Sequence, residues 1–165
     1  MDEKALVAKA RRGDRESFGK LYALYKDKLY RYALFRVGEE LAADAVSQCA
    51  LEAWRSIPSL RDEGAFQGWI FKLLYRTCAS QLKEQIRQRE TSDIDEVQLP
   101  YSQRLDAVEL SEALGSLSEQ EREIVLLSAV SGFSSKEIGK LLGLRSSTVR
   151  SKLSRSLKKL RDFLE

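Results

Sequence analysis

Apolar residues recur at a spacing of about 3.6 along most of the chain, which is the pattern of helices with one buried face. In the first half this pattern predicts four helices, near residues 3–12, 14–37, 39–57 and 65–89. Gly13, Gly38 and Pro58 stand at the breaks between them, where glycine or proline commonly ends a helix. The first half therefore has enough helical apolar surface to close a core of its own.

The second half of the chain predicts a compact set of further helices that begins near Leu105. Two Ser-x-x-Glu capping boxes, at 118–121 and 134–137, each mark the start of a helix. The second of these helices is short and ends at Gly143, and the last helix runs from near Ser146 almost to the end. We expect its apolar stripe to face inward: Val149, Leu153, Leu157, Leu160 and Leu164.

Between the two halves the helical periodicity fades and acidic residues accumulate. The segment also contains Pro100, which favours a connector between two units. The sequence thus predicts an all-α protein with two small helical domains, at residues 1–89 and 105–165, joined by an acidic linker at 90–104. Low counts of glycine (9) and proline (2) agree with a helical fold.

Charge is segregated along the chain, although the net charge is only +3. Residues 145–161 contain seven basic side chains and no acidic one, whereas residues 90–112 contain seven acidic side chains and one basic. Such a distribution favours binding of a polyanion at the C-terminal end. It leaves two interpretations of the acidic segment, a solvated tether or a mimic of nucleic acid.

Several classes of protein are disfavoured by what the sequence lacks. No apolar run approaches the ~18 residues of a membrane span, and no signal-peptide core follows Met1, so we expect a cytoplasmic protein without direct membrane insertion. Cys49 and Cys78 form no metal-binding motif and the chain has no histidine, so no metal or other cofactor is expected. Phosphate-binding loops and nucleophile elbows are also missing, and we expect no enzymatic activity.

The short helix, the turn at Gly143 and the longer basic helix together have the order of a helix-turn-helix. In such a unit the first turns of the second helix enter the major groove of DNA. The side chains placed to reach bases or phosphates are Arg145, Ser146, Ser147, Thr148, Arg150, Ser151, Lys152 and Arg155. The alternative is a basic helix face that is merely solvated.

These residues carry a resemblance to a known family. The runs Ser118–Leu127, Gly132–Gly139 and Ser147–Arg155 resemble region four of the extracytoplasmic-function (ECF) RNA polymerase sigma factors. The first half resembles region two of the same family, and the motifs follow in the family's order. Its matching positions are Gly13-Asp14, Ser17-Phe18, Leu21-Tyr22, Tyr25, Leu29-Tyr30, Ala33, Asp44-Ala45-Val46, Leu51, Trp54, Phe66, Gly68-Trp69-Ile70, Leu73 and Arg76.

The resemblance implies a protein that binds core RNA polymerase and promoter DNA, usually under the control of an anti-sigma factor. Region four would read the −35 element and contact the β flap, whereas region two would hold the −10 element as a single strand. The −10 contacts would come from Ser59, Arg61, Asp62, Lys72, Arg76, Thr77, Gln81, Lys83 and Arg87. Docking on the β′ clamp coiled coil would use Asp44, Ser47, Gln48, Leu51 and Trp54.

Two groups of residues in the first half also have a simpler interpretation. The basic residues at 72, 76, 83 and 87 share one helical stripe, which would also suit a solvated surface. The aromatic residues recur at core spacing, so we interpret them as packing residues rather than platforms for nucleobases: Tyr22, Tyr25, Trp54, Phe66 and Trp69.

Some family positions carry other residues in this chain. Ser47, Gln48 and Ala50 replace the usual Gln, acidic residue and Phe of the polymerase-docking helix. The alternative hypothesis is therefore a sigma-derived DNA-binding regulator with weak or lost polymerase binding. In the helix-turn-helix, Gly139 replaces a usual alanine, a change that we expect to cost about 1 kcal/mol at most.

Overall fold

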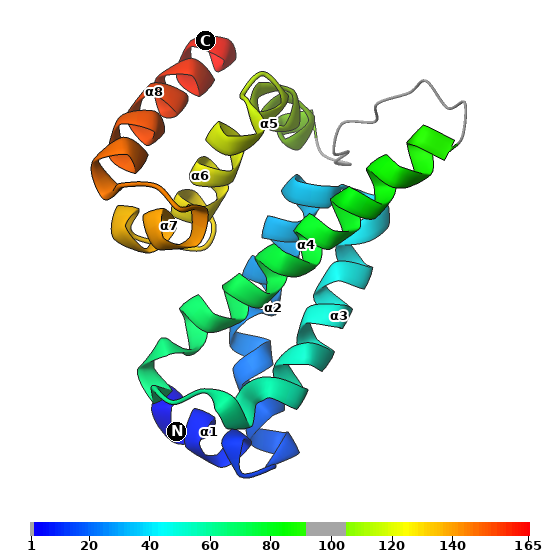
Figure 1. Cartoon of the computed structure of the whole chain (residues 1–165), viewed down its shortest axis with the longest axis vertical. Coiled ribbons are helices and arrows are strands. Elements are labelled where there is room, and N and C mark those ends of the chain that lie inside the picture. The colour runs from blue at the N-terminus through cyan, green and yellow to red at the C-terminus, as the bar shows by residue number, and fades with distance from the viewer. Residues whose placement is uncertain (1, 92–104) are drawn as a thin grey trace.

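The computed structural model describes residues 2–91 and 105–165, and over these residues the chain is all-helical, as predicted (Figure 1). Its α-helices are α1 (Glu3–Arg11), α2 (Arg15–Val37), α3 (Glu39–Ser56), α4 (Phe66–Thr91), α5 (Leu105–Gly115), α6 (Glu119–Ala129), α7 (Ser135–Leu142) and α8 (Ser146–Leu164). Two short 3-10 helices, η1 (Ile57–Ser59) and η2 (Glu63–Ala65), connect α3 to α4. Most of the expected linker, residues 92–104, lies outside the described residues.

The helix boundaries follow from local chemistry. Both predicted capping boxes are confirmed, because Ser118 and Ser134 accept hydrogen bonds from the backbone N–H groups of Glu121 and Glu137, at 3.2 and 3.1 Å. Each glutamate in turn accepts a hydrogen bond from the backbone N–H of its serine. These reciprocal bonds satisfy donors that the first turn of a helix leaves unpaired.

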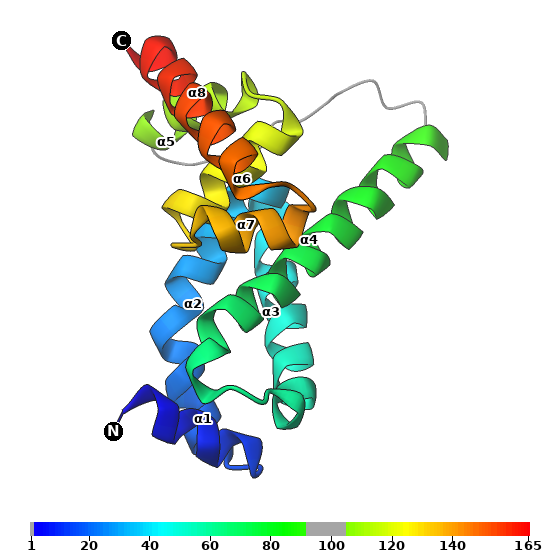
Figure 2. The ribbon, with the colours of Figure 1, turned by 60° about the vertical axis from the view of Figure 1, so that its left-hand side comes forward.

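The N-terminal half is a bundle in which the long helices α2, α3 and α4 pack along one another, with α1 across one end (Figure 2). Tyr25 and Phe66 are buried, and their ring centroids lie 5.6 Å apart. Phe18 meets Trp54 edge to face at 5.3 Å between centroids. Tyr22 and Trp69 pack against the same core while partly exposed. The interpretation of these aromatic side chains as packing residues is confirmed.

The C-terminal half is smaller and is organised around α8, which packs against α5, α6 and α7. Ile124 and Leu127 of α6, Ile138 of α7, and Val149 of α8 are fully buried. Val149, Leu153 and Leu160 of the apolar stripe of α8 therefore face the neighbouring helices.

The outer ends of two helices depart from the predicted pattern. Leu157 and Leu164 of α8 are about half exposed, although we expected them to face inward, and that prediction is wrong. Ile86 of α4 is likewise exposed. The last turns of α4 project beyond α2 and α3 in both ribbon views (Figures 1 and 2), so the helical period continues there without a packing partner.

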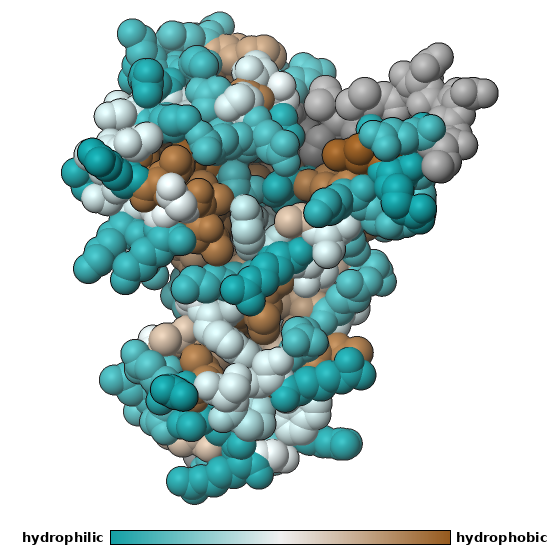
Figure 3. Space-filling model, viewed as in Figure 1, coloured by the Kyte–Doolittle hydropathy of each residue, from teal (hydrophilic) through white to brown (hydrophobic). Residues whose placement is uncertain are grey.

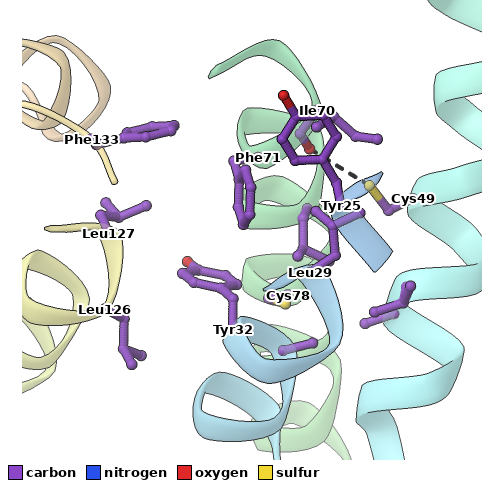
Figure 4. Packing of buried hydrophobic residues seen from close by; sticks show 14 of the residues in the cluster. Tyr25, Leu29, Tyr32, Cys49, Ile70, Phe71, Cys78, Leu126, Leu127 and Phe133 are labelled. Atoms are coloured by element: carbon purple, nitrogen blue, oxygen red, sulfur yellow. Dashed lines mark hydrogen bonds between the residues drawn. The ribbon is translucent and has the colours of Figure 1, made fainter. Parts of the chain in front are cut away.

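The hydrophobic core is continuous from one half to the other. Leu126, Leu127 and Phe133 of the C-terminal half face Tyr32 and Phe71 of the N-terminal bundle (Figure 4). Phe71 and Phe133 meet edge to face, with 6.2 Å between ring centroids. Each half therefore leaves apolar side chains that the other half covers, which the periodicity of single helices does not reveal.

The surface is largely hydrophilic on the face shown in Figure 3, with a hydrophobic patch over α7. Among the described residues, no helix combines the length and the apolarity needed to cross a bilayer.

Candidate nucleic-acid interface

Two glycines, Gly139 and Gly143, allow the backbone geometry of the turn between α7 and α8. Gly143 has the left-handed conformation, with φ 73° and ψ 33°, which a glycine adopts without steric cost. Gly139 lies against the turn so closely that a β-carbon there would be 2.5 Å from the carbonyl oxygen of Leu144. The expectation that Gly139 carries only a small propensity cost is therefore incomplete, because the glycine is required by the close approach of the backbone.

The exposed face of α8 is the basic surface that the helix-turn-helix presents. Arg150, Ser151, Ser154 and Arg155 line a shallow groove along it. Arg150 and Arg155 bond to Ser146 Oγ and to the carbonyl oxygen of Ser151 within the same helix, at 3.5 and 3.4 Å. Two guanidinium groups over exposed hydroxyls form a surface that suits phosphates and base edges.

The remaining candidates at the start of α8 differ in exposure. Arg145 is the exposed N-cap residue and makes no side-chain capping bond, and Ser147 is also exposed. Ser146 and Thr148 are half-buried. Because Arg145 does not cap the helix, the first N–H groups of α8 lack a side-chain acceptor from this position, which suits an anion.

Lys152 does not share the groove with Arg150 and Arg155. It is half-buried, and its ammonium group donates to the Gln120 side chain of α6. Ser154, in contrast, lies in the groove, and sequence reasoning missed it. The helical spacing could have identified it, because Ser154 follows Arg150 by four residues and so lies on the same face of the helix.

Lys159 is also turned toward α6, where its ammonium group lies 2.9 Å from Glu121 Oε2. The hydrogen bond from Lys159, together with the capping bonds of Ser118, lowers the pKa of Glu121 from 4.5 to about 2. These contacts fix the C-terminal part of α8 on α6, while the opposite face of the helix carries the groove.

The basic stripe predicted on α4 is present, and its side chains point outward. Lys72, Arg76 and Lys83 are exposed along the helix. Arg87, at the outer end, pairs with Glu84 at 2.6 Å. The stripe therefore presents positive charge at its first three positions and an ion pair at its last.

The loop before α4 brings polar groups to the start of this stripe. Asp62 caps η2 by accepting the backbone N–H of Gly64 at 2.9 Å, and Ser59 donates to the carbonyl oxygen of Ser56 at 2.6 Å. Arg61 is exposed between them. The loop is thus a short structured segment with one outward cation.

Two of the candidate −10 residues, which are both half-buried, hydrogen-bond to other groups of the bundle. Thr77 donates to the carbonyl oxygen of Leu73 at 2.9 Å. The Gln81 amide donates to Asp44 Oδ2 of α3, also at 2.9 Å, and its own oxygen is buried. In this conformation neither side chain extends outward with the basic stripe.

The face of α3 carries the residues expected to dock on polymerase. Ser47, Gln48 and Leu51 are exposed beside Asp44, which also accepts a hydrogen bond from Gln48 at 2.8 Å. Trp54 lies at the edge of this face and is half-buried against Phe18. Asp44 therefore links α3 to α4 through a hydrogen bond with Gln81.

The described residues contain no cluster of histidine, cysteine or carboxylate side chains able to hold a metal ion. Cys49 and Cys78 are buried free thiols, and burial raises the pKa of each to about 12. The geometry suits binding by exposed basic and polar helix faces.

Comparison with known proteins identifies both halves. The sequence model for "Sigma-70 region 2" matches residues 21–88, and that for "Sigma-70, region 4" matches residues 107–160. The two matches do not overlap and together include most of the chain.

Curated relatives are ECF sigma factors. The chain is 28% identical to the ECF RNA polymerase sigma factor BldN of Streptomyces coelicolor, over 96% of this chain and 64% of the relative. It is 30% identical to SigE of Mycolicibacterium smegmatis, over 90% of this chain and 62% of the relative. It therefore spans less than two thirds of these two relatives, but 91% of the ECF sigma-E factor of Escherichia coli, with 25% identity.

Solved structures agree in fold. CnrH, in complex with the cytosolic domain of CnrY, matches with a TM-score of 0.76 and 25% identity over 98% of this chain and 96% of that one. The sigma factor RpoE of Bartonella quintana, in complex with the anti-sigma factor NepR, matches with a TM-score of 0.78 and 26% identity, over 90% and 97%. With both regions in the family's order, the chain belongs to the sigma-70 family, as a sigma factor of the ECF type.

Proposed function

We propose that this protein is an ECF sigma factor that binds core RNA polymerase and directs it to a set of promoters. The observation that carries the proposal is the presence of two separate outward basic faces, on α4 and α8, in a chain that matches both sigma-70 regions. Sigma factors are not enzymes, and the proposal assigns no reaction to the chain.

The groove on α8 is the proposed reader of the −35 duplex. An α-helix fits the major groove, and arginine pairs with guanine through two hydrogen bonds. Arg150 and Arg155 are placed for such contacts or for phosphates, while Arg145 and Ser147 extend the surface toward the start of the helix. Lys152 supports the orientation of α8 on α6 instead.

The start of α4 and the loop before it form the proposed site for the −10 element. Lys72, Arg76 and Lys83 would contact successive phosphates of a single strand, and the loop from Ser59 to Gly64 would hold an extruded base. Thr77 and Gln81 would join them only after leaving their present partners.

The exposed face of α3 is the proposed docking site for the β′ clamp coiled coil, with Leu51 as its apolar centre and Ser47 and Gln48 around it. Region four would dock on the β flap. We assign the domains as residues 1–89 and 105–165, with 90–104 as the linker between them.

An anti-sigma factor is the proposed regulator. Two of the solved relatives are complexes, one of them of a sigma factor with an anti-sigma factor, and the other of CnrH with a cytosolic domain. By analogy, a partner that binds this chain would withhold it from polymerase in the cytoplasm.

In vitro transcription with purified core polymerase and a promoter library tests the proposal. We expect run-off products from templates that share −35 and −10 motifs, and the absence of any product above core enzyme alone would refute it. A pull-down with core polymerase tests the alternative of a regulator without polymerase binding, to which the residues Ser47, Gln48 and Ala50 point. Stoichiometric recovery of polymerase would exclude that alternative.

A further inference from the structure

We propose that the two regions of this chain hold each other in a closed form through a latch, which we define as Tyr32 and Arg36 of α2 and Glu123 of α6. The closed form is inactive, and the latch must open before both elements of a promoter are bound together. This inference rests on the proposed function, because it concerns whether the proposed −10 and −35 faces can act at the same time.

The latch is a charged cluster buried between the two regions. The side chains of Arg36 and Glu123 are only 7% and 4% exposed, and they form an ion pair. The Tyr32 hydroxyl donates to the other oxygen of the same carboxylate, and the tyrosine is fully buried. One carboxylate of region four thus receives two partners from one helix of region two.

Because the cluster is buried, its charged groups are stable only while they remain paired with one another. Burial raises the pKa of Glu123, although Arg36 and Tyr32 act in the opposite direction. A buried charge that loses its partner is strongly unfavourable, whereas charges that return to water together regain their hydration. The latch therefore favours two states, fully closed or fully open, over a partly separated interface.

The rest of the interface joins the start of α4 to the turn before α7. The Gln67 amide donates to the carbonyl oxygen of Ser131 at 2.8 Å, and Phe71 packs on Phe133. Figure 4 shows Tyr32, Phe71 and Phe133 along this boundary. A β-carbon at Gly68 would lie 3.7 Å from the carboxylate of Glu137, so the two regions approach closely there.

This interface adjoins one end of the region proposed to hold the −10 strand. A cleft of about 490 Å³ lies between the regions, lined on one side by Gly64, Gln67, Trp69 and Lys72. On its other side are Gly132, Phe133, Glu137 and Lys140. Glu137 and Lys140 line the same cleft as Lys72, so region four stands across the cleft from the first cation of the α4 stripe while the regions are together.

The distance between the promoter elements requires the regions to part. Elements centred at −35 and −10 are about 25 base pairs apart, or about 85 Å at ~3.4 Å per base pair. A compact chain of this length has a radius of gyration of about 15 Å, so the closed form cannot reach both. The residues between the described parts, 92–104, can span up to about 45 Å when extended, which permits separation without unfolding either region.

Small-angle scattering on the full chain tests the latch directly. We expect Glu123→Gln and Arg36→Met to raise the radius of gyration by several Å above about 15 Å, with unchanged helix content by circular dichroism. Glu119→Gln is the matched control, because Glu119 lies on the same helix and 3.5 Å from the same arginine, but is 75% exposed. Tyr32→Phe, which removes one hydroxyl, should open the chain to a smaller extent. An unchanged radius of gyration in folded Glu123→Gln and Arg36→Met proteins would overturn the proposal.

A reversible cross-link between the two regions distinguishes failure of this inference from failure of the proposed function. Cysteines at Ala65 and Lys140, which line opposite sides of the cleft, are bridged with a short reducible bismaleimide, while Cys49 and Cys78 remain buried. We expect the locked chain to lose at least 10-fold in promoter-dependent transcription, to regain it on reduction, and to keep its affinity for a −35 duplex throughout. Equal transcription before and after reduction would refute the latch. A reduced chain that never transcribes would instead refute the proposed function, and the scattering result would still decide the latch.

Discussion

The two helices that carry the basic faces, α8 and α4, are prepared for nucleic acid to different degrees. On α8 the arginines bond only within their own helix or turn outward, and α5, α6 and α7 cover the opposite side. On α4 the start of the helix faces the turn before α7, and the half-buried Thr77 and Gln81 side chains bond to Leu73 and Asp44. The proposed duplex reader is therefore exposed in this conformation, whereas two candidates of the proposed single-strand site would have to leave other partners to take part.

This difference is physically reasonable. Duplex DNA presents its phosphates and base edges before the protein arrives, so a rigid helix face can be complementary to it in advance. A single-stranded −10 element exists only after the duplex has melted, so a site for it gains nothing from permanent exposure.

Removal of both groove arginines should give the largest effect. We expect Arg150→Ala with Arg155→Ala to weaken binding of the −35 duplex about 100-fold, at ~1–3 kcal/mol for each contact. Because each lost phosphate contact lowers the salt dependence by about 0.9, the slope of log K against log salt should fall by about two. Fluorescence anisotropy over a salt series measures both quantities.

The control for this prediction is Lys159→Ala, which removes the same kind of charge from the side of α8 that faces Glu121. It should leave the affinity within about twofold, since long-range charge effects are screened at about 0.15 M salt. If the double variant and the control behaved alike, the groove on α8 would not be the DNA surface.

Gly139→Ala should disturb the turn that aims α8. The added β-carbon would lie 2.5 Å from the Leu144 carbonyl oxygen, and backbone atoms at that distance must move apart. We expect a loss of about 1–3 kcal/mol in the free energy of unfolding, and weaker binding of the −35 duplex.

Gly19→Ala is the matched control, because nothing lies within 4 Å of the position where its β-carbon would be. In the interior of α2 this change should stabilise the protein by about 0.5–1 kcal/mol. Urea unfolding followed by circular dichroism distinguishes the two outcomes, and equal stabilisation by both alanines would show that the turn tolerates a side chain.

On α4, Lys72→Ala with Arg76→Ala should weaken binding of a single-stranded −10 oligonucleotide about 10-fold, or about 1.4 kcal/mol. The affinity for the −35 duplex should stay the same, because these residues lie on another helix. The effect should grow in the Glu123→Gln background, where the regions have separated. A larger loss on the duplex than on the single strand would reverse the assigned roles of α4 and α8.

The smallest expected effect concerns pH. The pKa of Glu121 is lowered to about 2, so its contribution to stability is present above 4.5 and is lost as the pH falls from 4.5 toward 2. The effect should be at most about 1 kcal/mol, because Lys159 is exposed and the pair is screened. Thermal unfolding between about pH 2 and 6 should show a weaker acid dependence in both Glu121→Gln and Lys159→Met than in the wild type. If the acid dependence of stability remained unchanged in Glu121→Gln, another carboxylate would be its source.

Local features of the fold could be predicted from the sequence because they depend on neighbouring residues. The capping boxes at Ser118 and Ser134 and the left-handed Gly143 are examples, since their partners lie within four positions. The basic face of α8 follows in the same way from the helical period. Even Ser154, which is absent from the predicted set, could have been placed on that face by its spacing from Arg150.

Other features escaped prediction because they depend on which surfaces meet. The period of α8 does not say which of its turns meet a packing partner, so the exposure of Leu157 and Leu164 was missed. Gln81 was assigned to DNA by resemblance, yet its amide bonds to Asp44, 37 residues earlier. The demand for glycine at 139 likewise depends on the position of the Leu144 carbonyl group.

The helices, their caps, the segregated charge and the family of this protein could all be predicted from the sequence, because they depend on residue order and on short spacings. The contact of Arg36 and Tyr32 with a carboxylate from the other region, 87 and 91 residues away, could not. Contacts over such distances depend on how two formed surfaces fit, and no local pattern records them. For the same reason, tertiary packing sets how far each proposed DNA-binding face is exposed.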